Sequence, residues 1–207
     1  MRIGPRYKIA RRLGAHIFDK TSGPKFTLHL ARKKTAQGRK FSRGGDFAKA
    51  LLEKQKVRFH YGIAERQFKR YALDVIAKKT ANQDRALYEK LETRLDNVVY
   101  RLGLAASRAA ARQMVCHCHI RVNGKRVNMP SYGVYAGDVI SVRPGSMRKA
   151  IFNDISAKLQ EKQKEGFFPP WLTVEPKKVE AKITGMPQMK ETGTHFDFAP
   201  VLEFYKR

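Results

Sequence analysis

The chain has 207 residues, enough for one or two domains with real cores, and 42% of its residues are hydrophobic. Its 43 Lys and Arg against 18 Asp and Glu give a formal net charge of +25, which calls for a polyanionic partner. No apolar run approaches the ~20 residues of a membrane span, and the opening MRIGPRYK has no hydrophobic signal region. We therefore expect a cytoplasmic protein that binds nucleic acid, with an anionic membrane surface as the second candidate.

The positive charge is concentrated near the amino terminus. Residues 1–79 carry 22 Lys and Arg against 5 acids, a net charge of +17, whereas residues 80–155 carry +6 and residues 156–207 carry +2. Each phosphate contact adds roughly 0.7 to 0.9 to the salt slope of nucleic-acid binding. Most of the electrostatic affinity should therefore come from before residue 80.

Residues 1–45 are expected to form a basic, irregular amino-terminal arm. Gly, Pro, Ser and Thr interrupt any long periodicity, so the only predicted element is a short helix near residues 9–13. A charge run is usually a solvated face, but a basic arm without a partner would gain little by ordering. We predict that the arm contacts RNA through its cationic side chains, which are Arg6, Lys8, Arg11, Arg12, Arg32, Lys33, Lys34, Arg39, Lys40 and Arg43.

Residues 46–93 are expected to form three helices, at about 46–61, 64–79 and 84–93, as the first part of a helical domain. Asp46 is the predicted N-cap of the first helix and Gly62 its stop. The predicted core positions are Phe47, Ala50, Leu51, Val57, Phe68, Ala72, Val75, Ile76, Leu87 and Leu91. The predicted RNA-facing cations of these helices are Lys54, Lys56, Arg58, Arg66 and Arg70.

Residues 94–143 are predicted to form two short helices followed by a curled, mostly antiparallel sheet. Ser107 is a natural N-cap for the second helix, which continues to about Cys116. Asn123-Gly124 favours a two-residue hairpin, because both residues accept the positive φ angles of a primed turn. The outward polar side chains should grip phosphates and 2′-hydroxyls of a shaped RNA junction, and they are Arg108, Arg112, Gln113, His117, Arg121, Lys125 and Arg126.

Residues 144–207 are expected to pack back on the helical domain. The predicted elements are a helix over 147–165, a strand over 179–183, and a strand or short helix over 201–205. Trp171 is interpreted as a core anchor, although a base-stacking role is the alternative. The fold class is therefore α+β, a helical domain with an embedded small RNA-binding domain.

Cys116 and Cys118 lie in VCHCHI beside His117 and His119, which suggests a metal site. However, the chain contains no second ligand pair, and alternating residues at a helix–strand junction point to different sides. We expect the cysteines to be reduced and structural or incidental, with no metal and no cofactor.

The order of RLDN, VVYRLG, SRAAARQMV, HIRVNG, PSY and GDVISVR resembles the RNA-binding domain named after small-subunit ribosomal protein S-four. The same domain occurs in RNA-modifying enzymes and a tRNA synthetase. The flanking segments GPRYKIARRLG, LLEKQKVRFHYGIAERQFKRY, PPWL and LEFYKR are similar to the bacterial members of the ribosomal family. The resemblance therefore covers nearly the whole chain.

This resemblance implies binding to a multi-helix junction in the five-prime domain of small-subunit ribosomal RNA, early in assembly. It also implies contacts with the ribosomal proteins S-five and S-three, and an influence on decoding accuracy. Arg39, Lys40 and Arg43 match basic residues on the path by which messenger RNA enters. Many relatives carry cysteine zinc ligands in the arm, but no Cys precedes Cys116, so the chain resembles the zinc-free branch.

Two alternatives share the same RNA-binding domain. An RNA pseudouridine synthase uses an Arg-Leu-Asp motif, which Arg94-Leu95-Asp96 mimics. No segment remains for the separate sheet domain of those enzymes, so we interpret Asp96 as a helix-start or ion-pair residue and expect no enzyme. The other alternative is a ribosome-associated stress or quality-control factor, which would not be present on every small subunit.

Overall fold

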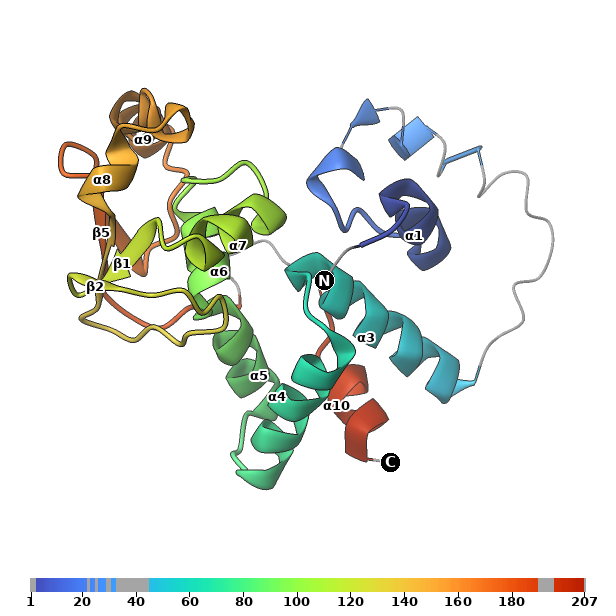
Figure 1. Ribbon diagram of the computed structural model, residues 1–207. Helices are drawn as coiled ribbons and strands as arrows, with labels where there is room; N and C mark the ends of the chain where they lie inside the picture. The colour runs from blue at the N-terminus through green and yellow to red at the C-terminus, as the bar shows by residue number, and fades with distance from the viewer. Residues whose placement is uncertain are drawn as a thin grey trace. The chain divides into compact units, whose positions relative to one another are not determined.

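A computed structural model describes residues 3–21, 23–24, 26–28, 31–32, 45–189 and 196–206 (Figure 1). The chain divides into two compact units. Unit 1 comprises Met1–Leu87 and His195–Arg207, and unit 2 comprises Tyr88–Thr194. Among the described residues, no helix combines the length and apolar character needed to cross a membrane.

Unit 1 is helical. Its elements are α1 (Arg6–Leu13), the 3-10 helix η1 (Asp19–Thr21), α3 (Asp46–Tyr61), α4 (Glu65–Ala77), the first part of α5 (Gln83–Glu92) and α10 (Ala199–Lys206). α1 and α3 each end at a glycine in the left-handed region, where a side chain would be strained: Gly14 has φ 66° and Gly62 has φ 64°. α10 packs against both α3 and α4.

The helix predicted over 46–61 has these bounds, but its inner face differs from the prediction. Gly45 occupies the N-cap position, so Asp46 lies in the first turn. Ala50 and Val57 are buried as predicted, whereas Phe47 is 52% exposed. The full buried face comprises Ala50, Lys54, Val57 and Tyr61, at spacings of four, three and four. Lys54 therefore lies on the inner face of α3 and not on the outer face where the sequence analysis placed it.

Unit 2 combines short helices with a five-stranded sheet (Figure 1). The helical elements after α5 are α6 (Leu95–Arg101), α7 (Arg108–Cys116), α8 (Pro144–Met147), the 3-10 helix η2 (Ala150–Phe152) and α9 (Ile155–Lys164). The strands are β1 (Ile120–Val122), β2 (Lys125–Arg126), β3 (Val139–Val142), β4 (Leu172–Glu175) and β5 (Glu180–Ile183). Their order is β2-β1-β3-β5-β4, and every neighbouring pair is antiparallel. The predicted α+β class is confirmed.

Of the described residues after 143, those of α10 pack against helices of unit 1, whereas β4 and β5 belong to unit 2. β5 pairs with β3, with Ile140 opposite Ala181, so β4 and β5 extend the sheet of unit 2. The predicted helix over 147–165 is broken, and α9 begins at Ile155 after Asp154, which has φ 58°. Trp171 is 2% exposed and belongs to the core of unit 2, as predicted. The predicted domain boundaries at residues 45, 93 and 143 stay a prediction.

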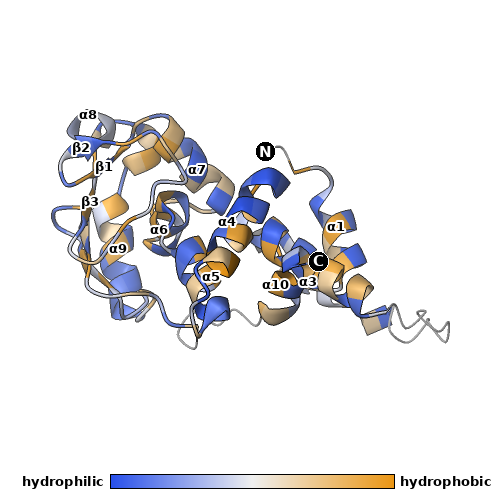
Figure 2. Cartoon of the chain, turned by 90° about the horizontal axis from the view of Figure 1, so that it is seen from below, coloured by the Kyte–Doolittle hydropathy of each residue, from blue (hydrophilic) through white to orange (hydrophobic). Residues whose placement is uncertain are grey.

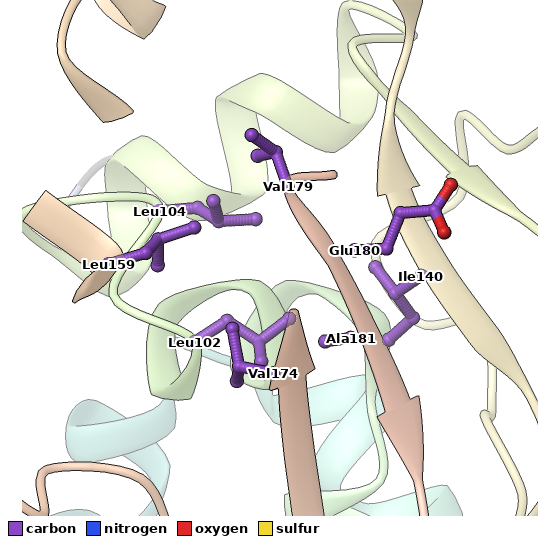
Figure 3. Close-up of a pocket in the computed structure, with 8 residues that line it drawn as sticks. All are labelled: Leu102, Leu104, Ile140, Leu159, Val174, Val179, Glu180 and Ala181. Atoms are coloured by element: carbon purple, nitrogen blue, oxygen red, sulfur yellow. The ribbon is translucent and has the colours of Figure 1, made fainter. Parts of the chain in front are cut away.

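The core of unit 2 contains apolar side chains from its helices and from strands β1, β3, β4 and β5. Figure 2 shows hydrophobic and hydrophilic residues on α9, which buries Ile155 and Leu159 on one face. Figure 3 shows a small hollow among Leu102, Leu104, Leu159 and Val174. It holds about 10 Å³, which is at most one water molecule, so it offers no space for a substrate.

Candidate RNA-binding surface

α7 is the centre of the candidate surface in unit 2. The Ser107 hydroxyl accepts a hydrogen bond from the backbone N–H of Ala110 at 3.3 Å, which confirms Ser107 as the N-cap. The helix buries Ala111, Met114 and Val115. Its other side presents the polar residues predicted to face outward: Arg108 and Arg112 are half-buried, and Gln113 is exposed, as is His117 at the C-cap.

Asp96 is an ion-pair residue, as predicted. The Arg94 guanidinium donates two hydrogen bonds to its carboxylate, Nε to Oδ1 at 3.0 Å and Nη2 to Oδ2 at 2.7 Å. Both side chains are buried. Arg112 Nη1 lies 3.7 Å from Asp96 Oδ2, so the same carboxylate attracts the arginine of α7. A carboxylate held in this way positions arginines and does not face a substrate.

A second polar cluster holds Arg108. Glu92 accepts hydrogen bonds from Arg101 Nη2 at 2.9 Å and from Asn97 Nδ2 at 2.8 Å. Asn97 Oδ1 in turn accepts from Arg108 Nε at 3.0 Å. The Arg108 guanidinium also stacks 4.4 Å from the centre of the Tyr100 ring. Arg108 is thus oriented before any ligand arrives, which lowers the entropy lost on binding.

The β1–β2 hairpin carries the second group of predicted contacts. Asn123 and Gly124 have φ 50° and 76°, so the predicted two-residue turn is confirmed. Arg121 on β1 lies directly opposite Arg126 on β2, and Lys125 is exposed beside them. Like charges in opposite positions of two strands are destabilising. An anion bound across the hairpin would relieve this repulsion.

The charges on this face of the sheet change sign from one edge to the other. Arg121 is also opposite Ser141 on β3, and Ser141 is opposite Glu180 on β5. Glu180 is opposite Glu175 on β4. Because residues opposite one another across a sheet share a face, this row runs from two arginines to two glutamates. This face is therefore positively charged at the β1–β2 edge and negatively charged at the β4–β5 edge.

The predicted contacts of unit 1 differ in exposure. The exposed cations are Lys8, Arg11, Arg12, Arg32, Arg66 and Arg70, and the half-buried ones are Arg6, Lys56 and Arg58. Lys56 pairs with Glu53 at 2.5 Å, and Arg58 Nε lies 3.4 Å from Glu65. The remaining predicted contacts lie outside the described residues, and they are Lys33, Lys34, Arg39, Lys40 and Arg43.

Lys54 has a structural role within unit 1. Its Nζ donates to Glu65 Oε1 at 2.8 Å, and the Tyr205 hydroxyl donates to the same oxygen at 2.7 Å. The ammonium group also lies 4.6 Å from the centre of the Phe204 ring. Burial alone would raise the pKa of Glu65, but these two hydrogen bonds and nearby cations leave it below its ordinary value. Burial and the Glu65 carboxylate raise the pKa of Tyr205. We therefore leave Lys54 out of the candidate surface.

The two cysteines lie at the carboxyl end of α7. Cys116 is exposed and Cys118 is half-buried, and both are free thiols. Cys118 has φ 56°, the left-handed conformation that glycine adopts more easily. Within the described residues, no group of three His, Cys, Asp or Glu side chains could hold a metal ion.

Comparison with known proteins gives matches along the whole chain. The family model for the ribosomal protein S4/S9 N-terminal domain matches residues 1–92, and that for the S4 domain matches residues 93–140. A protein from Chromobacterium violaceum named small ribosomal subunit protein uS4 is 39% identical over 208 residues, covering 99% of this chain and 98% of the relative. The uS4 protein of Laribacter hongkongensis is 39% identical over 206 residues, with the same coverage. A uS4A protein from Symbiobacterium thermophilum is 37% identical over 208 residues, again covering 99% and 98% of the two chains.

Proposed function

Since the chain belongs to the uS4 family of small-subunit ribosomal proteins, we propose that it holds together a junction of several helices in small-subunit ribosomal RNA. It is a structural, RNA-binding protein of the small ribosomal subunit and not an enzyme. The ribosome is in the cytoplasm, so this is where the protein acts. The resemblance drawn from the sequence motifs is confirmed at the level of the family.

The observation that carries the proposal is the pair of arginines on α7, each of which lies beside a polar partner in unit 2. Arg108 is held by Asn97 and Tyr100, and Arg112 by Asp96. The major groove of an RNA helix is too deep and narrow for side chains to read, so proteins recognise such helices by shape, phosphates and 2′-hydroxyls. Guanidinium groups suit this task, because their fork of N–H donors matches the geometry of phosphate oxygens.

The basic side chains of unit 1 supply the remaining contacts in this proposal. The arm over residues 1–45 and the exposed faces of the helices over 46–93 would clamp neighbouring RNA helices. Their described cations include Arg12 and Arg66, which are exposed and would meet phosphates in this proposal. Because unit 1 has most of the net charge, it should contribute most of the salt-dependent affinity.

The family resemblance supports finer proposals. The RNA target would be the five-prime domain of small-subunit ribosomal RNA, bound early in assembly. The protein partners would be S-five and S-three, with an effect on decoding accuracy. Arg39, Lys40 and Arg43 would face messenger RNA. Pseudouridine synthase activity is not favoured, because the Asp96 carboxylate forms ion pairs with Arg94 and Arg112.

The direct test uses the full chain and a transcript of the RNA five-prime domain. Arg112→Gln should weaken binding and lower the salt slope by roughly 0.7 to 0.9, the contribution of one phosphate contact. Arg126→Gln should do the same at the hairpin. Lys164→Gln, an exposed lysine at the end of α9, is the matched control and should leave the slope unchanged. Equal slopes for all four proteins would remove α7 and the hairpin from the RNA-binding surface.

A further inference from the structure

A second group of cations lies at the end of the sheet where β1 begins and β3 ends. The backbone N–H of Arg143 donates to the carbonyl of His119 at 2.8 Å, so these two residues face each other beyond the paired strands. The His117 ring stacks on the His119 ring, with centroids 6.1 Å apart and planes 13° apart. α8 follows Arg143 directly, at this end of the sheet (Figure 1). Arg143 and the residues of α8 and η2 were not among the predicted contacts.

Ser146 fixes the arrangement of this group. Its side chain is fully buried, and its hydroxyl oxygen accepts a hydrogen bond from Arg143 Nε at 3.2 Å. The same oxygen lies 2.9 Å from His119 Nδ1. The backbone N–H of Lys149 donates to the Ser146 carbonyl at 2.9 Å, which places Lys149 one turn further along. One buried hydroxyl thus orients Arg143, and the turn that begins there presents Lys149, which is exposed.

Arg143 and Lys149 differ from three other arginines of unit 2, each of which lies beside a carboxylate. Arg94, Arg101 and Arg112 each lie within 4 Å of a carboxylate. Among the described residues, no such ion pair involves Arg143 or Lys149. Burial lowers the pKa of the His119 ring, and the positive charges of Lys149, Arg143 and His117 lower it further. Positive potential is therefore concentrated here without neutralisation.

The group is continuous with the exposed face of α7. The backbone N–H of His117 donates to the Gln113 carbonyl at 2.9 Å, so His117 lies one turn beyond Gln113. Gln113 follows Arg112, which is already part of the candidate surface. An RNA strand that lies along Arg112 and Gln113 would reach His117 next and then Arg143 and Lys149.

We propose that His117, Arg143 and Lys149 form a further phosphate-binding site, which takes the next backbone phosphates of the RNA strand held by α7. The space beside Gly145 is open to the RNA backbone, because a Cβ built on this residue would meet only Arg143 Nε, at 4.0 Å. The inference rests on the proposed function, since it extends the same RNA-binding surface. The ligand is a phosphodiester of structured RNA, and free phosphate is the alternative source of the same chemistry.

The first test compares salt slopes for the full chain on the RNA five-prime domain. Lys149→Gln should lower the slope by roughly 0.7 to 0.9, so its affinity relative to wild type should change about threefold between 50 and 200 mM salt. Lys149→Arg should keep the wild-type slope, and Lys164→Gln is the control for loss of one exposed lysine in unit 2. If Lys149→Gln matches wild type while Arg112→Gln loses affinity, the further site is wrong and the proposed function stands. If wild type itself does not bind the junction, the proposed function fails.

The second test follows the histidine rings by NMR. Bound phosphate should raise the imidazole pKa of His119, because an anion offsets the surrounding cations. RNA should produce this rise in wild type and a smaller one in Lys149→Gln. Inorganic phosphate at the same phosphate concentration should not produce it. A similar rise with inorganic phosphate would contradict the RNA assignment, and no rise with bound RNA would overturn the site.

Discussion

The buried carboxylate of Asp96 holds two arginines of unit 2, so its charge should matter for stability. Asp96→Asn keeps the size of the side chain but leaves Arg94, 2% exposed, without its anion. Removing one partner of a buried pair costs about 3 to 5 kcal/mol. We predict a loss of about 3 kcal/mol in the free energy of unfolding, measured with urea. Glu161→Gln, exposed on α9, should change it by less than about 0.5 kcal/mol. Equal urea midpoints for Asp96→Asn and wild type would show that the pair is not structural.

His119 makes the stability of unit 2 depend on pH. Its pKa is below the ordinary value of 6.5 because it is buried and lies near Lys149, Arg143 and His117. The folded state therefore keeps the ring neutral where the unfolded chain takes up a proton. Stability should be full above pH 6.5 and should fall as pH decreases from 6.5 to the folded pKa. Urea unfolding at pH 7.5 and 5.5 measures the difference. His119→Gln should reduce this pH dependence and His117→Gln should retain most of it; an undiminished dependence in His119→Gln would refute the assignment.

Lys54 shows how a residue's role depends on partners that are distant in sequence. Its spacing from Ala50 and Val57 already places it on the inner face of α3, so its burial could have been predicted. The hydrogen bond from Tyr205 to the Glu65 carboxylate that Lys54 meets could not have been predicted, because Tyr205 lies 140 residues after Glu65. Basic character alone therefore did not identify an RNA contact.

A binding measurement separates these two roles of Lys54. Lys54→Met should leave the salt slope of RNA binding unchanged, because the buried ammonium group meets Glu65 and not a phosphate. Circular dichroism would confirm that the variant is folded. A slope lower by about 0.8 would instead return Lys54 to the RNA-binding surface.

At the scale of elements, the opposed arginines of the β1–β2 hairpin should lower the stability of the free protein and raise its affinity for RNA. Arg126→Glu replaces two opposed arginines by an ion pair with Arg121, which favours the free protein by roughly 0.2 to 1 kcal/mol. The same change places a negative charge against phosphate, so RNA affinity should fall. Thermal unfolding and RNA binding measured on one preparation test both signs. Lower stability together with unchanged affinity would contradict this view of the hairpin.

Local elements were predictable and distant pairings were not. The Ser107 N-cap and the Asn123-Gly124 turn depend on neighbouring residues, and both were predicted correctly. The pairing of β3 with β5 joins segments about 40 residues apart, and no short pattern specifies it. The predicted helix over 147–165 failed because Ile151, 56% exposed, belongs to η2 and not to the apolar face of α9.

At the scale of the whole molecule, the net charge of +25 predicts a polyanionic partner but not which one. The resemblance of the motifs supplied the family, and the structure supplied the arrangement of arginines that suits a folded RNA. The cation group at Arg143 and Lys149 was missed because it forms only when the end of β3 meets the start of β1. Each unit contributes its own set of exposed cations.

A footprint of the full chain on small-subunit ribosomal RNA tests the central claim most directly. At physiological salt, protection from hydroxyl radicals should concentrate at one junction of several helices in the five-prime domain. Arg112→Gln should lose part of that protection, whereas Lys164→Gln, with the same loss of charge, should keep it. Weak protection spread along the RNA, unchanged in position by Arg112→Gln, would contradict the account, because it would show attraction by charge alone.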